Sequence, residues 1–87
     1  MEEKKLILVI VPPIALATEF IEKLSNAFTV LTASSEEEGY QMLIRIATDI
    51  SAVLLDLKLA QQSNYSFAEK MSMDKLFTSV PVIALSP

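Results

Sequence analysis

The sequence predicts an α/β domain in which a mainly parallel sheet is covered by helices on both faces. Two observations lead to this prediction. Apolar runs without polar alternation recur along the chain, as expected for strands buried on both faces. Between these runs lie segments whose apolar residues follow the period of an amphipathic helix. Strands and helices that alternate in this way form right-handed crossovers, which make the strands parallel.

The first strand is expected at residues 6–11, an unbroken aliphatic run that ends at Pro12 and Pro13. Proline cannot donate a hydrogen bond to a neighbouring strand, so the strand stops there. A helix is expected to follow from Ile14 because the next apolar residues recur at intervals of three and four. They are Ala17, Phe20, Ile21, Leu24 and Phe28.

Residues 29–32 are expected to form a short second strand. Ser35 and Glu38 then have the spacing of a capping box, in which the serine hydroxyl accepts a hydrogen bond from a backbone N–H of the first helical turn. A second helix should therefore begin here and end near Asp49. Its apolar stripe comprises Tyr40, Leu43, Ile44 and Ala47.

The third strand is expected at residues 52–57, an apolar run interrupted by Asp56 alone. Polar residues at 61–65 predict a loop, residues 66–76 a third helix and residues 80–85 a fourth strand. The third helix is expected to begin with a second capping box, Ser66 and Glu69, and to bury Phe67, Met71 and Leu76.

Composition limits the chemistry of this domain. The 87 residues suit one domain, and 52% of them are apolar, which is enough for a core. With neither Cys nor His, the chain has no disulfide, no thiol nucleophile and no imidazole base. The net charge is −4 and the basic residues are scattered, which argues against nucleic-acid binding. No segment is typical of a signal peptide or a membrane span, so we expect a cytoplasmic domain.

Asp56 is the main candidate for a functional residue. Function gathers at the carboxyl edge of a parallel sheet, where this acid would end the third strand. An unpaired carboxylate within an apolar run is costly to bury, so Asp56 must lie at the open edge or have partners there. The residues alone leave two interpretations open: Asp56 caps a turn by accepting backbone N–H bonds, or it belongs to a functional site.

Three segments of the chain resemble strands of response-regulator receiver domains, the receiving partners in bacterial two-component phosphorelays. They are residues 6–11, Leu54-Leu55-Asp56-Leu57, and residues 80–86 with the sequence Val-Pro-Val-Ile-Ala-Leu-Ser. The resemblance implies a flavodoxin-like three-layer sandwich with strand order 2-1-3-4, over a single domain at 1–87 that lacks the fifth βα unit. It also implies that Asp56 matches the phosphoacceptor and Ser86 the switch hydroxyl.

The rest of the family's site is missing from this sequence. The positions that match the family's acidic pair, which holds Mg²⁺, are Ile10 and Val11, and neither side chain has an oxygen donor. The chain also ends before the strand that would carry the family's lysine. We therefore expect no bound metal or cofactor and no efficient phosphorylation of Asp56, because phosphoryl transfer needs charge neutralisation. Lys58 is a possible charge partner for Asp56.

The resemblance implies a degenerate receiver-like signalling module that is not an enzyme. Its partners would be proteins, such as a histidine kinase or an output domain, and a second copy in a homodimer. Two alternatives remain: a working phosphoacceptor that uses Asp56, and a purely structural dimerisation unit. A fragment of a longer regulator is favoured over an intact small protein that completes its sheet by pairing.

Two further features have ordinary structural interpretations. Residues 36–38, three consecutive glutamates, are interpreted as a helix N-terminus rather than a metal site, since acids there complement the helix dipole. Tyr40 and Tyr65 are candidates for an interface, although half-buried packing is the favoured interpretation.

Overall fold

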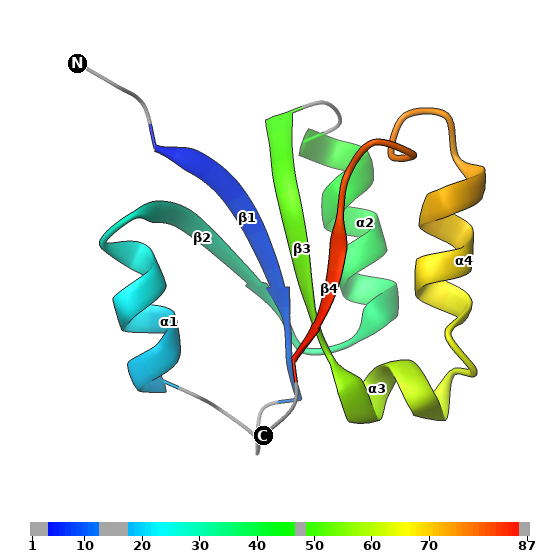
Figure 1. Cartoon of the computed structure of the whole chain (residues 1–87), viewed down its shortest axis with the longest axis horizontal. Coiled ribbons are helices and arrows are strands. Elements are labelled where there is room, and N and C mark those ends of the chain that lie inside the picture. Colours follow the sequence, from blue (N-terminus) through cyan, green and yellow to red (C-terminus); the bar gives the residue numbers. More distant parts are fainter. Residues whose placement is uncertain (1–3, 13–17, 47–48, 86–87) are drawn as a thin grey trace.

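The computed structural model describes residues 4–12, 18–46 and 49–85 and confirms the predicted α/β class. Its sheet has four parallel strands in the order β2-β1-β3-β4, with helices on both faces (Figure 1). This is the order that the resemblance to receiver domains implies. The strands are β1 (Lys5–Ile10), β2 (Phe28–Ala33), β3 (Ile50–Asp56) and β4 (Val82–Leu85), and the helices are α1 (Thr18–Ser25), α2 (Glu36–Ile46), α3 (Leu57–Gln62) and α4 (Ser66–Met73).

Strand β1 lies at the centre of the fold. Leu8 pairs with Leu31 of β2 on one side and with Val53 of β3 on the other. Helices also cover both faces of β1, so Leu8, Val9 and Ile10 are fully buried. This double burial explains why the strand is an unbroken aliphatic run.

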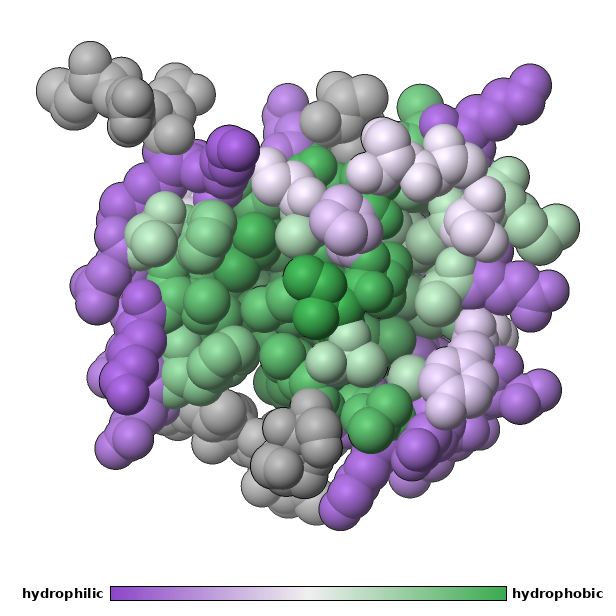
Figure 2. Space-filling model, in the orientation of Figure 1, coloured by the Kyte–Doolittle hydropathy of each residue, from purple (hydrophilic) through white to green (hydrophobic). Residues whose placement is uncertain are grey.

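The two faces of the sheet are covered unequally. Helices α2 and α4 pack on one face through Leu43, Phe67 and Met71 and form the larger core, while α3 lies at the carboxyl edge (Figure 1). On the opposite face α1 contributes Leu24 and lies over β2. The area over β4 is left open in the described part of the chain: Ile83 is 49% exposed there, whereas Leu54 beside it on β3 is buried. Figure 2 shows apolar side chains at the centre of this face.

The capping box at the start of α2 is formed in a modified way. The Glu38 backbone N–H donates to Ser35 Oγ at 3.1 Å, as the sequence predicts. The Glu38 carboxylate does not return to the Ser35 backbone but accepts from Ser34 Oγ at 3.0 Å. Both contacts hold the first turn of α2 in place.

Several predicted placements of apolar residues are wrong. Phe28 does not end the first helix but begins β2, after a turn closed by the Ala27 N–H on the Leu24 carbonyl at 3.0 Å. Ile44 is 58% exposed because α2 turns Gly39 and Leu43 toward the sheet instead. The first helix was predicted from Ile14, and its part before Thr18 lies outside the described residues, as does the predicted stripe residue Ala47.

Leu76, which was predicted to be buried, is 57% exposed. Helix α4 ends at Met73, and Asp74 adopts an extended conformation in which its Oδ1 accepts the Leu76 N–H at 2.9 Å. This break turns Leu76 outward and directs the next residue, Phe77, into the core at 1% exposure.

The segment between β3 and α4 also differs from the prediction. Helix α3 occupies Leu57–Gln62, so the loop predicted at 61–65 is shorter. The second capping box is wrong: Ser66 is the first residue of α4, and the cap position before it is Tyr65, which makes no side-chain capping bond. Asn64 and Tyr65 both have a positive φ, 56° and 61°, which lets two helices follow each other with a short turn.

Strand β4 begins at Val82 rather than at the predicted Val80. Pro81 has no N–H to donate, but its carbonyl accepts the Val53 N–H at 2.9 Å. In the described residues, no helix is long and apolar enough to cross a membrane.

Gly39 sets how closely α2 approaches the sheet. A Cβ atom built at this position would lie 2.5 Å from Ile10 Cδ1 and 2.9 Å from Ile10 Cγ1. Glycine is unfavourable in a helix interior, and here it is required because a side chain would overlap the core. Ile10 therefore fills the space that the missing Gly39 side chain leaves.

We predict that Gly39→Ala lowers the free energy of unfolding by about 1 kcal/mol, because overpacking costs ~1–3 kcal/mol and outweighs the alanine helix propensity. Urea denaturation measures this. In an Ile10→Val background, which removes Cδ1 but keeps the γ carbon at 2.9 Å, the same substitution should cost less. If Gly39→Ala alone, with Ile10 unchanged, is more stable than the parent, the close approach of α2 to Ile10 does not require glycine at position 39.

Candidate functional site at the carboxyl edge of the sheet

The four strands end at a common edge, at the bottom of Figure 1. Ile10, the last residue of β1, pairs with Leu55, and Asp56, the last residue of β3, pairs with Leu85 of β4. The topology thus brings the predicted positions Ile10 and Asp56 to neighbouring strand ends. Ser86 lies outside the described residues.

Asp56 acts as the N-cap of α3. Its Oδ2 accepts a hydrogen bond from the backbone N–H of Leu59 at 3.1 Å. The side chain is half-buried, and its backbone has the extended conformation typical of a cap, with φ −57° and ψ 128°. The residues alone leave two interpretations of Asp56 open, a cap or a member of a functional site. The geometry shows that Asp56 is a cap.

Ile10 and Val11 give this edge an apolar character. Ile10 is fully buried in the core beneath α2. Val11 is half-buried on the other face of the sheet, and its N–H still bonds to the Ala33 carbonyl at 3.0 Å. Neither side chain offers the oxygen donors that Mg²⁺ requires. Within the described residues, no three acidic side chains gather at a point where they could hold a metal ion.

Lys58 is exposed in the first turn of α3, two residues after Asp56. The hydrogen bond to Asp56 comes from the backbone of Leu59 and not from the Lys58 ammonium. A pairing between the two charges stays a prediction, and its exposed position would make it weak.

A second polar cluster joins α2 to the end of α4. The Tyr40 hydroxyl donates to Asp74 Oδ2 at 3.0 Å, and the Lys70 ammonium lies 4.6 Å from the centre of the Tyr40 ring. The hydrogen bond to Asp74 raises the pKa of Tyr40, and burial and the negative charge of Asp74 add to this effect. Sequence spacing does not predict this contact, because its partners belong to different helices.

Comparisons with protein-family models, curated proteins and solved structures return no significant match for this chain. The resemblance of the three segments to receiver domains therefore stays a prediction.

We predict that Asp56→Ala lowers the free energy of unfolding by about 1 kcal/mol, because the first turn of α3 loses its cap. Asp56→Asn should stay close to the parent, since asparagine caps equally well. Thermal or urea denaturation measures both variants, with the exposed Lys58→Ala as the control, expected within about 0.5 kcal/mol of the parent. Equal stability of Asp56→Ala and the parent would remove the capping role.

Proposed function

We propose that this chain is a degenerate receiver-like signalling module of the two-component type, which works through protein contacts and not through phosphoryl transfer. The observation that best supports the proposal is the burial of Ile10 at the strand end beside Asp56. At the position where the resemblance calls for a metal-binding acid, the chain has an isoleucine that belongs to the core.

The chemistry of phosphorylation supports this proposal. Transfer of a phosphoryl group to a carboxylate brings two anions together, and a cation normally neutralises them. Ile10 cannot be exchanged freely for an acid, because its side chain fills the space against Gly39. An aspartate there would place a charge in the core, which is costly. Asp56 meanwhile is engaged in capping α3.

The proposed partners are a histidine kinase or an output domain, bound through the surface of the module. The proposed compartment is the cytoplasm, where such modules work. The composition is compatible with this compartment, because the chain contains no cysteine and needs no disulfide.

We predict that incubation with acetyl phosphate and Mg²⁺ leaves the intact mass of the protein unchanged, because no cation is held beside Asp56. Intact-mass spectrometry measures this, with Asp56→Asn as the matched variant and a phosphorylatable receiver domain as the positive control. A stoichiometric phosphoryl adduct on the parent that is absent from Asp56→Asn would refute the proposal and favour a working phosphoacceptor.

We also propose that the module forms a homodimer through β4 and the open area of the sheet beside it. Ile83 is 49% exposed in this area, next to Leu54 on the neighbouring strand. Residues 76–85 contain no charged side chain. Charged residues, lysine above all, usually protect edge strands from pairing, and their absence here favours association with a second copy. Antiparallel pairing of two β4 strands would be self-complementary.

We predict that Ile83→Lys shifts the protein from dimer to monomer. Loss of a buried isoleucine costs about 1.5–3 kcal/mol for each copy, which raises the dimer dissociation constant more than tenfold. Sedimentation equilibrium measures the constant. Met73→Lys, which adds the same charge at an exposed position of α4, is the control and should remain dimeric. A parent protein that is monomeric at high concentration would contradict dimerisation but not the proposed signalling role.

A further inference from the structure

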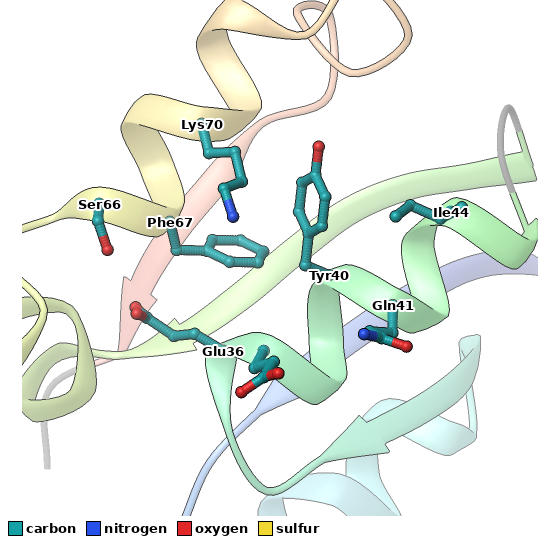
Figure 3. A pocket seen from close by; sticks show the side chains of 8 residues that line it. Glu36, Tyr40, Gln41, Ile44, Ser66, Phe67 and Lys70 are labelled. Carbon is teal, nitrogen blue, oxygen red and sulfur yellow. The ribbon is translucent and has the colours of Figure 1, made fainter.

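A groove runs between α2 and α4 on the outer side of the larger core. Its volume is about 450 Å³, within the range of sites that bind small ligands or the side chains of a partner. The residues that carry the argument below are Glu36, Glu37, Tyr40, Ile44, Phe67 and Lys70, and all of them except Glu37 are labelled in Figure 3. Asp56 is not part of its lining.

One end of the groove holds a carboxylate oxygen without a partner. Glu36 Oε2 is buried, and no described residue donates a hydrogen bond to it. The Lys70 ammonium points into the same groove but lies over the Tyr40 ring, 4.6 Å from its centre (Figure 3). A buried acceptor without a donor is costly, and more so when it is charged. The Glu36 side chain as a whole is only partly buried, so a ligand in the groove that supplies N–H donors would remove that cost once the carboxylate turns toward it.

The wall of the groove is aromatic and apolar. Tyr40 and Phe67 meet edge to face, with 6.4 Å between the ring centres, and Phe67 belongs to the core at 3% exposure. The hydrogen bond from Tyr40 to Asp74 fixes the tyrosine ring. Ile44 lies further along α2 and is 58% exposed. The groove therefore offers a rigid wall for an alkyl chain and a separate contact for a second apolar group.

The charges of the groove favour a cation over an anion. Glu36 and Glu37 lie on the α2 side, and Lys70 on the α4 side is the one basic residue of the lining. An anion that approached the start of α2 would meet two carboxylates. A guanidinium combines a planar set of donors for a carboxylate with a stem that packs on apolar surface, and it also stacks on aromatic rings.

We propose that the groove between α2 and α4 binds an arginine-bearing segment of a partner protein. The guanidinium donates to Glu36, the arginine stem lies against Tyr40 and Phe67, and an adjacent aliphatic residue contacts Ile44. This goes beyond the proposed function because it assigns a recognition site and the chemistry of the partner, and its test leaves Asp56 unchanged.

The test is a titration of the ¹⁵N-labelled protein with acetyl-Ile-Arg-amide, followed by amide chemical shifts. The matched probe is acetyl-Ile-citrulline-amide, which has nearly the same shape but no charge. Saturable shifts of amides at Tyr40, Gln41, Phe67 and Lys70 are expected with the arginine probe. The citrulline probe should cause much smaller shifts.

Three variants test the role of each group. Glu36→Gln should weaken binding about tenfold, the effect of losing a charged hydrogen bond, while Glu69→Gln outside the groove lining should not. Ile44→Ala should weaken it several-fold, while Leu76→Ala, with nearly equal exposure at 57%, should leave it unchanged. Lys70→Gln should tighten binding, because it removes the cation that competes for the site.

Several results would overturn the proposal. These are the absence of saturable shifts, equal binding of both probes, unchanged binding to Glu36→Gln, or weaker binding to Lys70→Gln, the last of which would indicate an anion site. A well-dispersed spectrum of each variant confirms that it is folded. The phosphorylation test above does not depend on any of these outcomes.

Discussion

The contact between Gly39 and Ile10 is the constraint on which the rest of the structure depends. It lets α2 lie directly on β1, one of the two central strands of the sheet. It also makes the end of β1 part of the core, because Ile10 has no exposed surface. At a strand end where a metal site would need an oxygen ligand, packing requires an aliphatic side chain. The stability of the fold and the proposed loss of phosphoryl chemistry therefore have the same cause.

The close packing of α2 against the sheet also determines the position of the second polar cluster, which is formed by Tyr40, Lys70 and Asp74. Tyr40 follows Gly39 directly, so the close approach of the helix fixes the tyrosine between α2 and α4. There it contacts Phe67 and Phe77 edge to face and donates to Asp74. The groove and its unpartnered glutamate oxygen lie beside this cluster. The placement of α2 against β1 thus determines the shape of both the sheet edge and the groove.

The sequence predicted the strands better than the segments between them. Unbroken aliphatic runs have few alternatives to a doubly covered strand, so the parallel sheet and the position of Asp56 at its edge followed from the pattern, while the order of the strands was implied only by the resemblance to receiver domains. Helix ends depend on single contacts. Asp74 accepts the Leu76 N–H just after α4, and Phe77 instead of Leu76 enters the core. Asp56 caps α3, a helix that was not predicted and that overlaps the end of the predicted third strand and the start of the predicted loop. The hydrogen bond from Tyr40 to Asp74 joins residues distant in sequence, and such a contact cannot be predicted from periodicity.

The central place of β1 has a consequence for synthesis of the chain. Lys5–Ile10 leaves the ribosome first among the strands, yet its two neighbours are complete only after Asp56 has been made. Pairing between strands so distant along the chain is slow, and an unpaired apolar strand is prone to aggregate. A nascent chain that pauses before β3 carries such a strand with one side open. During translation, before β3 is available, β1 is therefore exposed to aggregation.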